Sequence, residues 1–190
     1  MLTRSVALDS EHINLRERAT VERVQELDLS RYRILHFATH GVLGDEVGLT
    51  TQPALVLSQI GEKGKHGGLL QFADILDLNL NADLVVLSAC STGLGRLRQG
   101  EGIVGLTRAF LYAGASSVVV SLWKVEDQST SLLMEHFYER LKQGESEAEA
   151  LRQAKLDVMR STVELKAIGM HQSLASPFYW APFVLVGQAH

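Results

Sequence analysis

Two segments of this 190-residue sequence end in residue types that can carry out nucleophilic chemistry. The apolar run 83–89 (DLVVLSA) is followed by Cys90, the single cysteine of the chain, and the run 33–40 (RILHFATH) ends in His40. A thiol attacks an amide efficiently only as a thiolate, and a nearby imidazole can take its proton. The two segments therefore indicate a cysteine–histidine pair, provided that they lie side by side.

The fold decides whether these residues can meet. In open α/β sheets, sites form just beyond the carboxyl ends of the strands. If the two runs are neighbouring parallel strands, His40 and Cys90 face each other at one end of the sheet. Gly41 and Gly93 would then let backbone N–H groups approach a developing oxyanion.

Other interpretations of these motifs stay open on the residues alone. A lone cysteine after a strand is more often an inert, small apolar residue, and spacing by itself favours that interpretation of Cys90. His36, inside the first run, is predicted to be a core histidine with its hydrogen bonds satisfied. The stretch GEGIVG at 100–105 matches a dinucleotide-binding pattern, but it begins about ten residues after Cys90 instead of directly after the strand, which argues against nucleotide binding.

Composition excludes several classes of protein. The formal net charge is −4 and the basic residues are scattered, which argues against direct nucleic-acid binding. No apolar stretch is long enough to span a membrane, and the N-terminus lacks the apolar core of a signal peptide. One cysteine forms neither an internal disulfide nor a cysteine-rich zinc site. We therefore expect a soluble protein in the reducing cytoplasm, with no metal and no cofactor.

Apolar strand-like runs alternate with amphipathic segments along the chain. This alternation predicts an α/β fold with a mostly parallel sheet covered by helices on both faces. Strands are expected at 33–40, 54–60, 83–89, 117–123 and 177–187, and helices at 20–29, 70–80, 101–114, 129–144 and 146–161. The stripe expected to face inward from the helix at 101–114 consists of Val104, Leu106, Thr107, Phe110 and Leu111, with Gly114 as its C-cap.

Taken together, the motifs resemble the CHAT family, which belongs with caspases and separases among the caspase-fold cysteine peptidases of clan CD. The matching stretches occur in family order and are YRILHFATHG (32–41), ADLVVLSACSTGLG (82–95), GEGIVGLTRAFLYAGASSVVVSLWKVED (100–127), FYERLKQG (137–144), ALRQAK (150–155) and PFYWAPFVLVG (177–187). The resemblance implies a caspase-like three-layer sandwich. It also implies a catalytic dyad of His40 and Cys90 and an oxyanion hole built from the backbone N–H groups of Gly41 and Cys90.

The resemblance extends to substrate specificity. The segment 121–130 (SLWKVEDQST) is similar to a separase segment in which an aspartate helps to hold a basic side chain before the cleaved bond. The matching position is Asp127, with Glu126 beside it, and a carboxylate there suits arginine through a bidentate pair. An equally weighted alternative is that Asp127 caps the helix that follows.

The sequence differs from the family pattern in its extent. Only 31 residues precede the strand at 32–41, whereas CHAT domains normally have more chain there and often follow tetratricopeptide or other helical repeats. We expect residues 1–19 to be a tail or severed linker, and residues 20–190 to be the larger, C-terminal part of a CHAT domain that could lack its N-terminal strands. A missing strand would leave a sheet edge available for association.

The sequence thus predicts a caspase-like cysteine endopeptidase in bacterial regulation or defence signalling. It would cleave protein substrates after a basic residue, with tetratricopeptide or other sensor repeats as partners in cis or in trans. The alternative is a catalytically inactive interaction domain that docks on repeat-containing partners.

Overall fold

The computed structural model describes residues 13–42, 52–58, 65–88, 99–124, 126–165 and 170–188 of the chain. The chain divides into two compact units, each described by itself. The sheet unit contains residues 8–124 and 186–188, and the helical unit contains residues 125–185. Within the described ranges, no helix is both long enough and apolar enough to cross a membrane.

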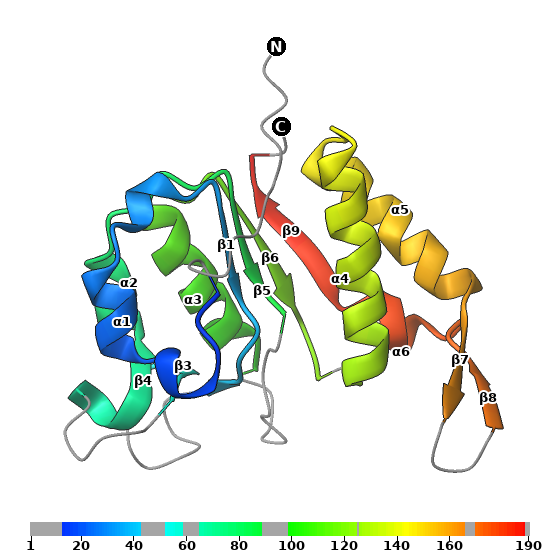
Figure 1. Cartoon of the computed structure of the whole chain (residues 1–190), viewed down its shortest axis with the longest axis horizontal. Coiled ribbons are helices and arrows are strands. Elements are labelled where there is room, and N and C mark those ends of the chain that lie inside the picture. The colour runs from blue at the N-terminus through cyan, green and yellow to red at the C-terminus, as the bar shows by residue number, and fades with distance from the viewer. Residues whose placement is uncertain are drawn as a thin grey trace. The chain divides into compact units, whose positions relative to one another are not determined.

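In the sheet unit, β1, β5 and β6 lie side by side in that order (Figure 1). Strand β9 completes a four-stranded sheet with the order β1-β5-β6-β9, and its residues 183–185 belong to the helical unit. β1 and β5 run parallel, as do β5 and β6, so the predicted α/β fold with a mostly parallel central sheet is confirmed. A smaller antiparallel sheet has the order β2-β3-β4. The elements are η2 (Arg16–Arg18), α1 (Val21–Glu26), η3 (Leu29–Arg31), β1 (Ile34–Phe37), β2 (Gly41–Val42), β3 (Ala54–Val56), η4 (Lys65–Gly68), β4 (Leu69–Gln71), α2 (Phe72–Leu76), β5 (Leu84–Leu87), α3 (Gln99–Tyr112), β6 (Ser117–Ser121) and β9 (Phe183–Gly187).

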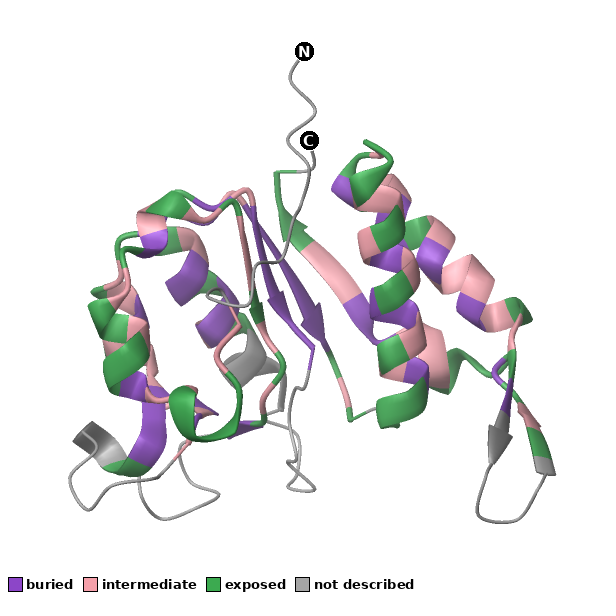
Figure 2. Ribbon diagram, viewed as in Figure 1, coloured by how far each residue is buried: buried purple, intermediate pink, exposed green. Residues whose placement is uncertain are grey.

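The core of this unit forms around β5 and β6. Every residue of these two strands is buried, as expected for parallel strands with apolar side chains on both faces (Figure 2). Helix α3 packs on the sheet through Phe110, whose ring centroid lies 5.4 Å from that of Phe37 on β1. Burial of one such aromatic side chain is worth roughly 1.5–3 kcal/mol, so α3 and the sheet stabilise each other.

Two details of the predicted core are wrong. Strand β1 was predicted to be buried, but its apolar residues are only partly covered and His36 is exposed. Within the described part of the chain, β1 has a strand neighbour on one side only, which leaves its backbone edge uncovered. Val104, predicted to face inward from α3, is 45% exposed. The buried stripe of this helix passes instead through Leu106, Phe110 and the residues three or four positions from each of them.

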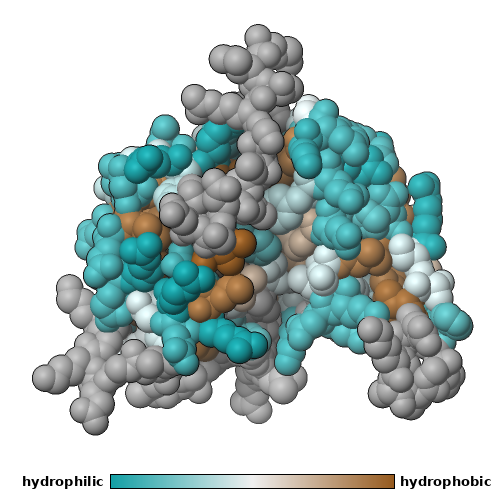
Figure 3. Space-filling model, viewed as in Figure 1, coloured by the Kyte–Doolittle hydropathy of each residue, from teal (hydrophilic) through white to brown (hydrophobic). Residues whose placement is uncertain are grey.

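The helical unit is an antiparallel helix pair with a β-hairpin and a short helix. Its elements are α4 (Asp127–Lys142), α5 (Glu147–Arg160), β7 (Thr162–Leu165), β8 (Met170–Ser173) and α6 (Pro177–Trp180). Leu133 and Phe137 of α4 are fully buried, and α5 buries the small side chains of Ala150 and Ala154, which allow close packing between helices. The outward residues of both helices are mainly charged, and they contribute hydrophilic surface in Figure 3.

The stretch 177–187, predicted as a single strand, is divided. Its first four residues form α6, since Pro177 occupies the first helical turn and the Ser176 hydroxyl accepts a hydrogen bond from Phe178 N. Only Phe183–Gly187 is a strand. The hairpin β7–β8 and strand β4 were not predicted.

Two helices end in the same glycine motif. At the end of α3, Ala115 N donates to Phe110 O and Gly114 N donates to Leu111 O, which is the Schellman pattern. Gly144 ends α4 with the same pair of bonds, and both glycines have positive φ. They differ in surroundings: a Cβ on Gly114 would lie 2.2 Å from the Leu80 carbonyl oxygen, whereas a Cβ on Gly144 would meet nothing within 4 Å.

This difference gives a matched pair of variants. We expect Gly144→Ala to cost roughly 1–2 kcal/mol, the usual penalty of a left-handed residue with a Cβ. Gly114→Ala should cost more, because the backbone at Leu80 must also move. Urea unfolding of both variants measures the difference, and equal losses would contradict a steric role for the contact with Leu80.

The first turn of α5 carries an acid-sensitive ion pair. Glu149 accepts hydrogen bonds from Arg152 and from Gln153, and these contacts, with Arg152 first, lower the pKa of Glu149 from 4.5 to about 2. Because the folded pKa lies below the unfolded one, this contribution is complete above pH 4.5 and is lost as the pH falls towards 2.

We therefore expect Glu149→Gln to lower the melting temperature slightly at pH 7, and this deficit should shrink as the pH falls from 4.5 through 2. The effect is small because Glu149 is exposed to water. Glu135→Gln, at an exposed position of α4, is the control and should show no such convergence. A deficit of Glu149→Gln that was as large at pH 2 as at pH 7 would show that the carboxylate charge is not its cause.

Candidate active site

The segment after β1 is fixed to the small antiparallel sheet. The Thr39 hydroxyl donates to the Val56 carbonyl, and Val56 N donates to the His40 carbonyl over 2.7 Å. Together these two bonds attach Thr39 and the carbonyl group of His40 to Val56 on β3. The His40 side chain is exposed, so its imidazole is accessible from solvent just beyond the carboxyl end of β1.

Gly41, the predicted oxyanion-hole residue, is the first residue of β2 and is buried. It lies opposite Leu55 in the antiparallel ladder, and the Val56–His40 bond identifies this as a non-hydrogen-bonded pair. The N–H of Gly41 therefore points away from β3 and is not used by the β2–β3 ladder.

The carboxyl ends of β1 and β5 lie side by side. Phe37 and Leu87, the last residues of the two strands, are partners in the parallel register, and Ser88 N donates to the Phe37 carbonyl over 3.3 Å. The condition stated from the sequence, that the two runs are neighbouring parallel strands, is thus met. Cys90 follows Ser88 by two residues in the sequence and lies outside the described residues.

A side-chain bond also joins these strands. His36 Nε2 and Ser88 Oγ lie 2.8 Å apart. His36 is hydrogen-bonded as predicted, but it is exposed and not a core residue. Desolvation by the surrounding protein lowers the pKa of His36 to about 4. Ser88 was missed from the sequence, because only the strand register pairs it with a histidine 52 residues away.

The predicted specificity residues lie at the start of α4 in the helical unit. Glu126 is the N-cap residue of that helix, yet its side chain makes no capping hydrogen bond. Asp127 is the first residue of the helix itself, where a negative charge interacts favourably with the helix dipole. Asp127 is therefore not the N-cap, contrary to the alternative interpretation. Both side chains are exposed.

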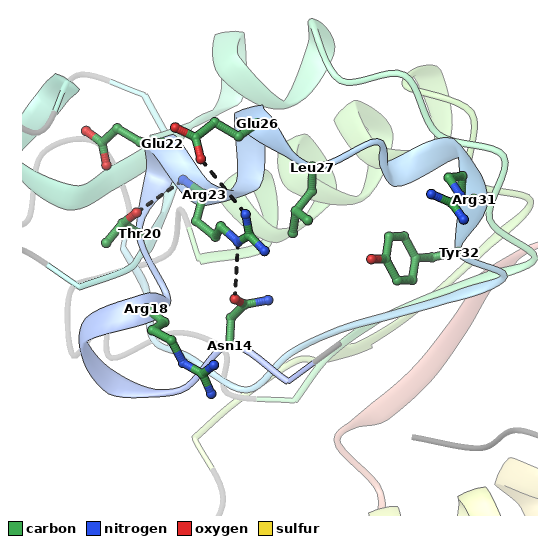
Figure 4. Close-up of a pocket in the computed structure, with 9 residues that line it drawn as sticks. All are labelled: Asn14, Arg18, Thr20, Glu22, Arg23, Glu26, Leu27, Arg31 and Tyr32. Atoms are coloured by element: carbon green, nitrogen blue, oxygen red, sulfur yellow. Dashed lines mark hydrogen bonds and ion pairs between the residues drawn. The ribbon is translucent and has the colours of Figure 1, made fainter. Parts of the chain in front are cut away.

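An open groove of about 800 Å³ lies elsewhere on the sheet unit (Figure 4). Arg23 Nε donates to Asn14 Oδ1 over 3.5 Å, and Arg18 donates to the Ile13 carbonyl over 3.1 Å. The lining residues are Asn14, Arg18, Thr20, Glu22, Arg23, Glu26, Leu27, Arg31 and Tyr32. The groove contains neither His40 nor Gly41, so it is not part of the candidate active site. Among the described side chains, no group of three or more His, Cys, Asp or Glu is placed to hold a metal ion.

Comparison with known proteins identifies relatives and a family. Tetratricopeptide repeat protein 28 of Mus musculus is 37% identical to this chain over 119 residues, and the Homo sapiens protein of the same name is 35% identical over 119 residues. These segments cover 63% of this chain but only 4% of either relative. The relatives are mammalian, so the predicted bacterial setting stays a prediction.

The family model of the CHAT domain matches residues 1–188, nearly the whole chain. The match agrees with the mostly parallel α/β sheet and with the order of the sequence motifs. The chain therefore belongs to the CHAT domain family, a caspase-like family of the cysteine peptidase type.

Proposed function

We propose that this protein is a caspase-like cysteine endopeptidase in which Cys90 is the nucleophile and His40 the general acid–base. The observation that carries the proposal is the parallel register of β1 and β5, which ends at the pair Phe37 and Leu87. His40 follows the first of these residues by three positions and Cys90 follows the second by three. In the sequence, both residues thus come shortly after the same end of two neighbouring strands, and sites form at this end in parallel α/β folds.

The reaction begins with transfer of the Cys90 thiol proton to His40. The thiolate attacks the scissile carbonyl carbon, and the carbonyl oxygen becomes an oxyanion. The tetrahedral intermediate collapses to a thioester, and the leaving amine takes its proton from His40. Water, activated by the neutral imidazole, then hydrolyses the thioester. The exposed imidazole of His40 is free to move towards either partner as these steps require.

Backbone N–H groups of Gly41 and Cys90 would stabilise the oxyanion. For Gly41 this role is supported by its place in the ladder, since its N–H points away from β3. A backbone donor held by the neighbouring Val56–His40 bond needs no reorganisation when negative charge develops.

Asp127 and Glu126 would select a basic residue before the cleaved bond. The Glu126 side chain makes no capping hydrogen bond to α4, and both carboxylates are exposed and available to a guanidinium or ammonium group. We expect the substrate to be another protein of the cell and the activating signal to reach the domain through its partners. The two tetratricopeptide repeat relatives support repeat domains as partners, in cis or in trans.

The dyad is tested with a library of peptides that contain arginine or lysine before the scissile bond. We expect Cys90→Ala and His40→Ala each to lower cleavage by at least about a thousandfold, because nucleophile and base act as a unit. His171→Ala is the matched control, since His171 is an exposed histidine of β8 in the helical unit, and it should leave cleavage unchanged.

A second readout separates the peptidase from an inactive interaction domain. A peptide with arginine beside an electrophilic ketone should label Cys90, the single cysteine, and His40→Ala should slow that labelling. Cleavage that survives Cys90→Ala would disprove the nucleophile. Absence of both cleavage and His40-dependent labelling would favour the interaction domain.

Specificity for a basic residue is tested at Asp127. Hydrogen bonds to charged groups contribute about 1.5–3 kcal/mol, so Asp127→Asn should lower the ratio of kcat/KM for arginine over leucine substrates roughly 10- to 100-fold. Glu135→Gln, further along α4, is the control for a change of net charge. An unchanged ratio in Asp127→Asn would remove Asp127 from substrate recognition.

A further inference from the structure

The bond between His36 and Ser88 links the two strands that lead to the proposed dyad. His36 lies on β1, one residue before its end, and Ser88 directly follows β5. His36 Nε2 and Ser88 Oγ are 2.8 Å apart. The bond therefore crosses between the strands at the end from which the chain continues to His40 and to Cys90.

Ser88 has two attachments to β1, one from its backbone and one from its side chain. Its N–H donates to the Phe37 carbonyl over 3.3 Å, which is long for a ladder bond. The shorter side-chain bond to His36 supplements this contact at the point where β5 ends. Because Ser88 is only 8% exposed, its hydroxyl has little water to replace a lost partner.

His36 acts here through geometry and not through charge. With its pKa lowered to about 4, the imidazole is neutral at pH 7, and a neutral ring does not stabilise a nearby thiolate electrostatically. A neutral imidazole either donates to the serine oxygen through Nε2 or accepts the serine proton there, so the bond forms in either tautomer.

We propose that His36 and Ser88 form a positioning pair that fixes the exit of the nucleophile strand against the histidine strand. The inference rests on the proposed function, because it assigns the pair a role in holding Cys90 and His40 at reacting distance. Neither member of the pair touches the substrate. The pair acts by holding Ser88, from which the chain continues to Cys90, against β1.

The same two strands offer a matched control at their opposite end. Arg33, directly before β1, is bonded to Asp83, directly before β5. This ion pair also joins the two strands through side chains, but at the amino ends, away from the proposed site. Arg33→Ala should therefore affect strand pairing without affecting the dyad.

The experiment measures catalysis and thiol chemistry in the full chain. We expect His36→Ala and Ser88→Ala each to lower kcat roughly tenfold with KM within about twofold, since small misplacements of reacting groups are costly. The double variant should have a kcat no lower than the single variants, because each single substitution already removes the bond that the two residues share. His36→Gln, which keeps a side-chain amide able to bond Ser88, should recover part of kcat. The Arg33→Ala control should keep kcat.

Alkylation of the single cysteine by iodoacetamide supplies a readout independent of substrate. Its rate against pH reports how easily Cys90 loses its proton, and both His36→Ala and Ser88→Ala should shift this profile towards that of His40→Ala. Ser88→Ala is nearly isosteric, and circular dichroism and melting temperature will show whether each variant remains folded.

The outcomes separate the two proposals. If Cys90→Ala abolishes cleavage while folded His36→Ala and Ser88→Ala keep both kcat and the alkylation profile, the positioning pair is wrong and the peptidase stands. Additive losses in the double variant, or an equal loss of kcat in Arg33→Ala, would also overturn the pair. If Cys90→Ala retains cleavage, the proposed peptidase itself falls.

Discussion

The parallel pairing of β1 with β5 is the constraint on which the candidate site depends. The paired residues, such as Ile34 and Leu84, are 50 positions apart in the chain, so no local interaction brings their segments together. A register slip by one residue would turn the side chains of a strand to the opposite face of the sheet. The register therefore fixes both the separation of the strand ends and the direction in which the chain leaves each strand.

Burial makes that register specific. β5 is central in the sheet and buried at every position, whereas β1 is partly exposed and has its strand neighbour on one side among the described residues. Most of the free energy that holds β1 must come from β5 and from the contact of Phe37 with Phe110. Side-chain bonds add to this contribution at each end of β1, through Arg33 and through His36, although the exposed ion pair of Arg33 adds little.

The sequence predicts the elements better than it predicts their contacts. The strands at 83–89 and 117–123 were correctly expected, because apolar β-branched runs report burial directly. The run 177–187 was misassigned because Pro177 and Ser176 start a helix within an aromatic stretch that also suits a strand. The hairpin β7–β8 has strands of only four residues, and while β7 (TVEL) alternates polar and apolar residues, β8 (MHQS) does not, so the pattern is too short to predict a hairpin.

The candidate site shows the same difference between elements, which the sequence predicts, and contacts, which it predicts less well. The position of His40 after a strand followed from the sequence, whereas the adjacency of that strand to the one that precedes Cys90 was only a condition, which the register of β1 and β5 meets. The choice between an inert and a nucleophilic Cys90 could not be made from spacing, and it came from the resemblance of the whole motif set to CHAT domains. The partner of His36 required the register, which no single segment of the chain encodes.

The segment HFATH also shows why two histidines four residues apart need not share a role. In a continuous strand, residues i and i+4 point to the same face of the sheet. Here β1 ends at Phe37, between the two histidines, and the chain then joins the small sheet through Thr39 and the carbonyl of His40. His36 thus remains on the sheet, where it bonds to the neighbouring strand end, while His40 follows the strand and is exposed. The end of one strand therefore separates a residue that is bonded within the sheet from the residue that we propose as the general acid–base.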